Sequence, residues 1–286
     1  MSDSVKFTDL NLNSQLLNAI EEMGFTHPTP IQHKVFPVVM SGRDVVGIAQ
    51  TGTGKTLAFL LPILRNLKYS EQRHPRVLIV VPTRELVIQI VERLEELTAY
   101  ITCRIEGVYG GANINTQKQN IHDNGVDILV ATPGRLADLA LSGVLRLKTV
   151  KQLVIDEMDE MLNLGFRPQL LNILDMLPDK RQNLLFSATI TDDVEFFVNE
   201  FFHQPEKIEA AGAGTPVELI TQQRYSIPNF LSKAALISGL LSDKDTYNKV
   251  LVFAGSRKFA DRLFEKLDPA YPEEIGVIHS NKSQNY

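Results

Sequence analysis

A glycine-rich stretch between two apolar runs contains the residues with the clearest chemistry. Residues 49–56 are Ala-Gln-Thr-Gly-Thr-Gly-Lys-Thr. Glycines allow the backbone to curl so that successive N–H groups point at a polyphosphate, and a helix after the loop adds its positive dipole end. Lys55 would supply a charge for the outer phosphates, and the Thr56 hydroxyl would ligate Mg2+. The stretch predicts a nucleotide-binding loop made of Ala49, Gln50, Thr51, Gly52, Thr53, Gly54, Lys55 and Thr56.

One position of this loop departs from the strict phosphate-loop pattern, because Ala49 stands where the pattern has its first glycine. A flexible glycine turn with a solvated lysine is the alternative interpretation. That alternative does not account for the apolar runs 45–48 and 57–61 on either side of the loop. A buried strand, a glycine loop and a buried helix in this order favour the phosphate-binding interpretation.

Two adjacent carboxylates follow another apolar run. Asp156 and Glu157 come directly after Leu153-Val154-Ile155. In a chain with a phosphate loop, we expect Asp156 to hold Mg2+ through water and Glu157 to orient and deprotonate the attacking water. A solvated acidic helix start is the alternative, since carboxylates favour helix N-termini. With the loop lysine present, the predicted catalytic residues are Lys55, Asp156 and Glu157.

Hydroxyl, arginine and glycine residues lie at the ends of four other predicted strands. Threonine and arginine at helix N-termini suit contacts with a nucleic-acid backbone, and nothing here suggests that bases are read. Ser187 and Thr189 could instead contact Asp159 or a bound phosphate. Taken singly, each segment is also a plausible helix cap. The backbone-contact candidates are Pro82, Thr83, Arg84, Gly110, Gly111, Thr132, Pro133, Gly134 and Arg135.

Apolar strands alternate with helices along the first two thirds of the chain. Strands rich in Val, Ile and Leu without alternation are buried on both faces, which indicates an α/β fold with a doubly wound parallel sheet. Such sheets bind ligands at the carboxyl ends of their strands. The predicted strands are 44–48, 76–81, 104–109, 126–131, 152–155 and 183–186. The predicted helices are 14–23, 85–97, 116–122, 136–141, 161–164, 168–177 and 193–202, with Ser14 capping the first.

The length of 286 residues indicates two domains. Residues 210–220 are mostly small and uncharged, so we expect a linker there between a first domain, 1–209, and a second, 221–286. The second domain is predicted to contain three strands and two helices. These are strands 222–227, 250–253 and 275–278, and helices 230–241 and 259–267.

Composition excludes several classes of protein. With a net charge of −5, any nucleic-acid site must be a local patch rather than a global basic surface. The one cysteine, Cys103, cannot form an internal disulfide, which fits a structural role in a reducing compartment. No apolar run approaches the ~20 residues of a membrane helix, and no signal peptide follows Met1. We expect a cytoplasmic protein.

The ordered set of motifs resembles the DEAD-box ATP-dependent RNA helicases. Gly24-Phe25 and Pro28-Thr29-Pro30-Ile31-Gln32, with Phe7 seventeen residues before Gly24, are similar to the family's Q motif, here spanning 7–32. The resemblance implies that Gln32 reads adenine, that Phe7 stacks on it, and that Phe25 and Thr29 belong to the same nucleotide site. Residues 49–56 are similar to motif I, which starts with alanine in this family. Residues 156–159 correspond to the box that names it, with Met158 where alanine is usual.

The same resemblance extends to the strand-end segments. It implies that 82–86, 110–111 and 132–135 contact the RNA backbone, and that Asp159, Ser187 and Thr189 couple hydrolysis to RNA. Residues 250–254 resemble motif IV of a second RecA-like domain. Residues 279–284 resemble the start of the next motif, and the family's arginine-finger motif does not follow. We therefore expect an incomplete second domain and weak activity.

The function implied by the resemblance is ATP hydrolysis, with Mg2+, used to remodel or unwind RNA duplexes. RNA would be the partner, bound without sequence specificity, and a membrane would not be involved. Two alternatives stay open: a nucleotide- or RNA-binding fragment without catalysis, and another superfamily-2 ATPase that acts on DNA. RNA-stimulated phosphate release would distinguish an RNA helicase from a fragment without catalysis. A comparison of RNA with DNA as the stimulating nucleic acid would distinguish it from an ATPase that acts on DNA.

Overall fold

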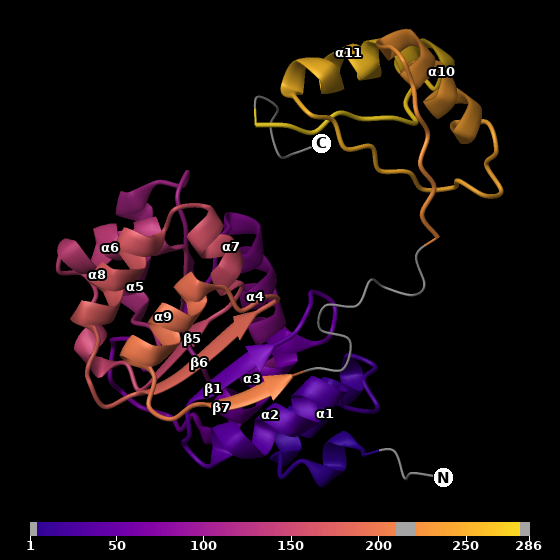
Figure 1. The fold of residues 1–286 in the computed structure, drawn as a ribbon. Helices are drawn as coiled ribbons and strands as arrows, with labels where there is room; N and C mark the ends of the chain where they lie inside the picture. The colour runs from indigo at the N-terminus through magenta and orange to yellow at the C-terminus, as the bar shows by residue number, and fades with distance from the viewer. Residues whose placement is uncertain (1–4, 210–220, 281–286) are drawn as a thin grey trace. The chain divides into compact units, whose positions relative to one another are not determined.

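The computed structural model describes residues 5–209 and 221–280, and the chain divides into two compact units, Met1–Glu218 and Leu219–Tyr286. Figure 1 shows the course of the chain through both units. The division falls within the predicted linker, whose residues lie outside the described ranges.

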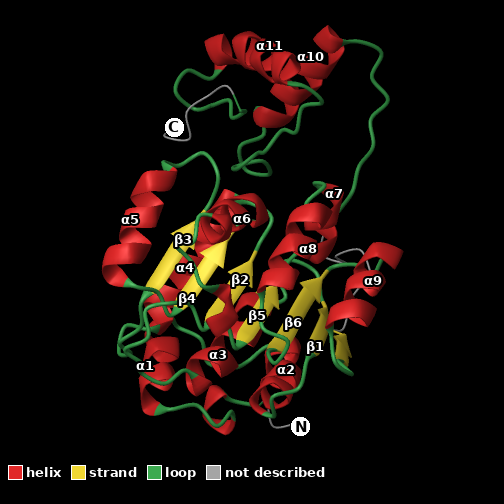
Figure 2. Cartoon of the chain, turned by 90° about the vertical axis from the view of Figure 1, so that its left-hand side faces the viewer, coloured by secondary structure: helices red, strands yellow, loops and turns green. Residues whose placement is uncertain are grey.

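The first unit is built on a seven-stranded, all-parallel sheet with the order β3-β4-β2-β5-β6-β1-β7. Helices cover both of its faces, which confirms the predicted doubly wound α/β fold (Figure 2). Because the strands are parallel, all their carboxyl ends meet at one edge. The strands are β1 Val45–Ile48, β2 Val77–Val80, β3 Ile105–Val108, β4 Ile128–Ala131, β5 Gln152–Ile155, β6 Gln182–Ser187 and β7 Glu206–Glu209.

The two faces of the sheet form separate apolar cores. Successive strand residues point to opposite sides, so Val45 packs in the core beneath the first four helices and Val46 in the other. The first core contains α1 Ser14–Glu22, α2 Pro30–Met40, α3 Lys55–Asn66 and α4 Arg84–Leu97. The second contains α5 Ile114–Asn124, α6 Pro133–Leu141, α7 Met158–Asn163, α8 Arg167–Met176 and α9 Asp192–Phe201.

One local prediction in the first unit was wrong, and one strand was missed. The side chain of Asn13, not Ser14, caps α1, since Asn13 Oδ1 accepts a hydrogen bond from the Leu16 N–H at 2.9 Å. Strand β7 was not predicted at all. Its sequence, Glu-Lys-Ile-Glu, has one apolar residue, Ile208, which is enough for a strand at the edge of the sheet beside β1.

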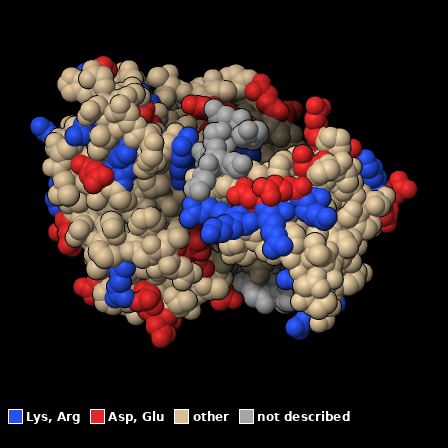
Figure 3. Space-filling view, turned by 90° about the horizontal axis from the view of Figure 1, so that it is seen from above, with Lys and Arg blue, Asp and Glu red and all other residues tan. Residues whose placement is uncertain are grey.

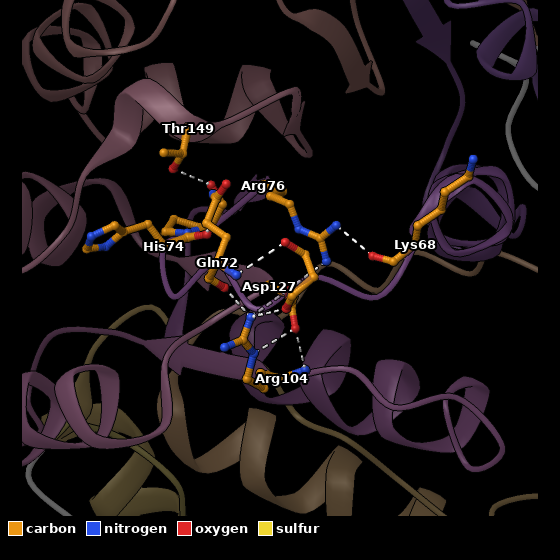
Figure 4. Close-up of polar contacts among 9 residues, drawn as sticks. Lys68, Gln72, His74, Arg76, Arg104, Asp127 and Thr149 are labelled. Carbon is orange, nitrogen blue, oxygen red and sulfur yellow. Dashed lines mark hydrogen bonds and ion pairs between the residues drawn. The ribbon is translucent and has the colours of Figure 1, made fainter.

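An ion cluster around the buried Asp127 fixes the amino edge of the sheet, opposite the strand ends predicted to bind ligands. Figure 4 shows its polar contacts. Asp127 accepts hydrogen bonds from Arg76 at 2.7 Å and from Arg104 Nε at 2.9 Å. Arg76 also donates to the Lys68 carbonyl at 2.6 Å, so the connection between α3 and β2 is tied to β4. Burial alone would raise the pKa of Asp127, but the hydrogen bonds from Arg104 and Arg76 hold it below its usual value.

The surroundings of Cys103 fit the structural role expected for it. Burial, with a smaller contribution from Asp127, raises the pKa of the Cys103 thiol to about 12. The thiol is therefore protonated at neutral pH and a poor nucleophile, as a structural cysteine should be.

None of the helices in the described ranges is both long enough and apolar enough to cross a bilayer. Lys and Arg side chains gather in a short row beside acidic ones instead of covering the surface seen in Figure 3.

The second unit contains helices α10 Phe230–Leu241 and α11 Arg257–Leu267, followed by a 3-10 turn, Asp268–Ala270. The strands predicted at 222–227, 250–253 and 275–278 are wrong, since residues 221–280 contain no strand. Several apolar side chains of these segments are exposed, including Phe253 at 90% and Ile278 at 84%. An apolar run becomes a strand only where neighbouring strands satisfy its backbone groups.

Candidate nucleotide-binding site

A cleft of about 510 Å³ opens at the carboxyl edge of the sheet in the first unit. It brings together residues that are far apart in the sequence, from the predicted Q motif, the glycine loop and the end of β5. The predicted nucleotide and catalytic residues that line it are Phe7, Phe25, Thr29, Gln32, Thr51, Gly52, Gly54, Lys55, Thr56, Asp156 and Glu157.

The other three loop residues support the loop without lining the cleft. The Ala49 N–H donates to the Ser187 carbonyl at 3.0 Å, which continues the pairing of β1 with β6. The Thr53 hydroxyl donates to the Gln50 carbonyl at 2.8 Å and closes the turn. These contacts fix how the loop leaves β1.

The glycine loop has the backbone shape that a phosphate requires. Gly52 and Gly54 adopt φ angles of +87° and +92°, which disfavour other residues. A Cβ on Gly54 would lie only 2.5 Å from Gln32 Nε2. The loop then continues directly into α3, whose first residue is Lys55. Curled backbone, helix N-terminus and lysine together fit a polyphosphate.

Gln32 joins the predicted Q motif to the glycine loop. It is buried on α2, where Thr29 is the N-cap and Pro30 the first helical residue. Gln32 Oε1 accepts from the Thr29 N–H at 2.9 Å, and Nε2 donates to the Gly54 carbonyl at 3.1 Å. The side chain therefore holds the loop in addition to any role in reading a base, which stays a prediction.

Lys55 and Asp156 form a buried pair at the base of the cleft. Lys55 Nζ lies 3.8 Å from Asp156 Oδ1, and the two residues are 6% and 4% exposed. Burial raises the pKa of Asp156 to about 6, although Lys55 acts to lower it. A desolvated carboxylate with a single distant cation partner has capacity for a further positive charge, which fits Mg2+.

The donors available for that ion are oxygens, as Mg2+ prefers. The Asp156 carboxylate and the Thr56 hydroxyl line the same cleft. Within the described ranges, no three His, Cys, Asp or Glu side chains gather into a metal centre. Phosphate oxygens and water would therefore complete the coordination, which is usual for nucleotide-bound Mg2+.

Glu157 has an unusual backbone. Its φ and ψ are 54° and 50°, a left-handed conformation at the N-cap of α7. Such a conformation costs roughly 1–2 kcal/mol in a residue with a Cβ, and strain of this kind often occurs at functional sites. The following residue, Met158, is fully buried in the second core, so the larger side chain is accommodated.

Asp159 connects the first turn of α7 to the end of β6. Its Oδ2 accepts from the Thr189 hydroxyl at 2.8 Å and from the Thr189 N–H at 3.0 Å, while its N–H donates to Ser187 Oγ at 3.3 Å. Burial raises the pKa of Asp159, but the bonds from Thr189 and Ser187 hold it below its usual value. Thr191 caps α9, so the capping alternative for Ser187 and Thr189 is wrong.

The backbone-contact candidates lie at the carboxyl ends of β2, β3 and β4. Thr83 caps α4, and Thr132 precedes Pro133 and Gly134 at the start of α6. Gly110 and Gly111 follow β3, with Gly111 at a φ of +84°. Arg84 stacks over the Tyr109 ring at 4.9 Å. Arg135 donates to Gln117 Oε1 at 2.5 Å and to the Ala112 carbonyl at 3.0 Å.

These contacts orient both arginines within the protein. The Nε atoms of Arg84 and Arg135 are buried and make no hydrogen bond. The structure therefore brings the candidates to one edge, while Pro82, two residues after the end of β2, is buried. Their contact with RNA stays a prediction.

One wall of the cleft was not predicted. It comes from α4, whose residues Leu86, Gln89, Ile90, Glu92, Arg93 and Glu96 line the cleft beside Phe25. Their spacing of three and four residues places most of them along one helix face. That spacing is visible in the sequence, but nothing local indicates that the face lines a ligand site instead of solvent.

The chain is similar to known helicases in sequence and in fold. Residues 29–197 match the model of the DEAD/DEAH box helicase family. The chain is 38% identical to the ATP-dependent RNA helicase RhlB of Pseudomonas syringae pv. tomato, a match that covers 92% of this chain and 68% of that protein. It is 40% identical to the DEAD-box ATP-dependent RNA helicase RhpA of Helicobacter pylori, over 91% of this chain and 52% of that protein.

A similar fold is found in the crystal structure of a DEAD box protein from the hyperthermophile Methanococcus jannaschii. The two structures superpose with a TM-score of 0.68 at 33% sequence identity. The match covers 98% of this chain and 74% of that one.

Proposed function

The chain belongs to the DEAD/DEAH box helicase family, and from that premise we propose that it is an ATP-dependent RNA helicase, which hydrolyses ATP to remodel or unwind RNA duplexes. One observation carries the proposal most directly. The glycine loop, Lys55, Asp156 and Glu157 line a single cleft at the carboxyl edge of a parallel sheet. This is where such sheets bind nucleotides, and these groups are the ones phosphoryl transfer needs.

The cofactors are ATP and Mg2+. Lys55 and the N–H groups of the loop hold the phosphates, and Gln32 together with Phe7 and Phe25 receives the adenine. Asp156 and the Thr56 hydroxyl hold Mg2+, which when bound neutralises charge on the outer phosphates. Glu157 orients the attacking water and accepts its proton. The left-handed backbone of Glu157 supports this role, because strain of this kind often occurs at functional sites.

RNA is the proposed partner, bound through its backbone at 82–84, 110–111 and 132–135. Asp159, Thr189 and Ser187 support the proposed coupling, because their hydrogen bonds join the helix after the catalytic carboxylates to the neighbouring strand. A movement of α7 on hydrolysis would therefore reach β6. We propose that 1–209 form the ATP-binding domain and that 221–286 belong to a second RecA-like domain. The single cysteine supports a cytoplasmic location.

Phosphate release tests the proposal. We expect release from ATP to depend on Mg2+, to rise when single-stranded RNA is added, and to rise less with DNA of the same sequence. The Glu157→Gln variant should bind ATP and release no phosphate above background. Equal stimulation by RNA and DNA would favour a DNA-directed ATPase. Binding of ATP and RNA without turnover would favour a binding module, and either result would reject the proposal.

A further inference from the structure

The α4 wall of the cleft carries a side chain to which none of the motifs assigns a role. Arg93 lies on α4 and lines the cleft together with Phe25. Its guanidinium is 5.9 Å from the centroid of the Phe25 ring. Arg93 Nη1 also donates to Glu96 Oε2 at 2.8 Å. Two neighbours therefore hold the guanidinium, while 38% of its side chain remains exposed.

The charges around Arg93 indicate which part of a ligand it would meet. Glu96 neutralises it, and Glu92 adds a second carboxylate to the same wall. Two acids and one arginine make this wall unfavourable for a polyphosphate. Lys55 and the glycine loop also line the cleft, and they supply the positive charge and N–H groups that phosphates require. A nucleotide would therefore place its phosphates at Lys55 and its base and ribose beside Phe25 and Arg93.

We propose that Arg93 is a further nucleotide-binding residue that contacts the base and ribose, an inference that rests on the proposed function. Its planar guanidinium can lie over a purine ring and donate to ribose oxygens, which an ammonium cannot do equally well. Phe25 and Glu96 hold the guanidinium at the cleft, so less side-chain freedom is lost on binding. Arg93 thus contacts the nucleoside, and Lys55 contacts the phosphates.

Titration calorimetry of the full chain with ATP, ADP, AMP and tripolyphosphate tests this assignment. We expect Arg93→Ala to raise the Kd for all three nucleotides by the same factor, about five- to tenfold, in line with a partly desolvated cation–π contact. Tripolyphosphate should bind the variant as it binds the wild type. Arg93→Lys should bind the nucleotides at least threefold more weakly than wild type, because lysine restores the charge but not the planar guanidinium.

Arg43→Ala provides a matched control. Arg43 is also partly exposed and is paired with a glutamate, Glu206, at 2.9 Å, but it does not line the cleft. Its removal should leave every Kd unchanged. Thermal unfolding of each variant checks that the fold is kept, and Arg93→Gln replaces the alanine variant if that one unfolds.

Three results would overturn the assignment. They are unchanged affinity of Arg93→Ala for AMP, a loss that grows with the number of phosphates, and full recovery by Arg93→Lys. The second and third would mean that Arg93 acts only through long-range charge. Failure of the wild-type chain to bind any adenine nucleotide would instead reject the proposed function, so the two failures are distinguishable.

Discussion

Replacement of Gln32 by alanine tests how the Q motif acts on the nucleotide site. The side chain is 3% exposed and makes two hydrogen bonds, to the Thr29 N–H and to the Gly54 carbonyl. Its loss removes the direct bond between α2 and the glycine loop. If Gln32 only read the base, the substitution would change the preference for adenine and nothing else.

The magnitude follows from the bond that reaches the loop, which Gln32 donates to the Gly54 carbonyl. A typical hydrogen bond contributes about 0.5–1.5 kcal/mol. The bond favours the loop conformation in which Gly54 has its left-handed φ of +92°. If the loop loses that preference, the affinity for any polyphosphate falls roughly two- to tenfold, since about 1.4 kcal/mol is a factor of ten.

Calorimetric titrations of wild type and Gln32→Ala with ATP, GTP and tripolyphosphate separate the two roles. We expect tripolyphosphate to bind more weakly because the loop is loosened, and ATP to lose its advantage over GTP because the base contact is gone. Gln119→Ala is the control, since Gln119 is an exposed glutamine whose side chain donates to Asp123 and is not among the residues that line the cleft. Unchanged tripolyphosphate affinity would refute the loop role, and a retained preference for ATP would refute base reading.

Three further substitutions follow from the site and the core. Lys55→Ala should weaken ATP binding at least tenfold, because a charge-assisted contact of about 1.5–3 kcal/mol is lost. Calorimetry measures the affinity, and unchanged binding would contradict the phosphate-loop assignment. Glu157→Gln should keep ATP affinity but lose turnover in a phosphate-release assay, and wild-type turnover would show that Glu157 is not the base. Asp127→Asn should destabilise the first unit by about 3–5 kcal/mol in urea unfolding, because the buried Arg76 and the half-buried Arg104 lose their anion. Since the folded pKa of Asp127 is lowered, its stabilisation is present above the ordinary carboxyl pKa and lost as pH falls through the folded value. The variant should therefore lose less stability on acidification, and parallel pH profiles would contradict this.

The elements that the sequence predicted well are those whose signals are local. Buried parallel strands appear as continuous apolar runs, and the expected strands of the first unit all formed. The glycine loop was recognisable because Gly52 and Gly54 fill positions that need positive φ. The edge strand β7 was not predicted, because one apolar residue, Ile208, is all that its exposed position requires.

The contacts that give the cleft its shape come from positions far apart in the chain. Gln32 meets Gly54 across 22 positions, and Arg93 on α4 reaches the ring of Phe25, which lies between α1 and α2. No local pattern distinguishes the α4 face that lines the cleft from a solvated face. Such contacts depend on the order of strands in the sheet, which sets which helices are neighbours, and composition or periodicity does not specify that order.

The second unit shows that an apolar segment does not always form a strand. Residues 250–253 have the apolar composition of a buried strand, yet they form none, and the Phe253 side chain is 90% exposed. In the first unit, β1 has a similar composition and pairs with β6 on one side and β7 on the other. The difference is therefore the presence of neighbours, because a strand without a ladder leaves its backbone groups to water. Composition predicts which segments favour pairing, and the partners available decide which of them become strands.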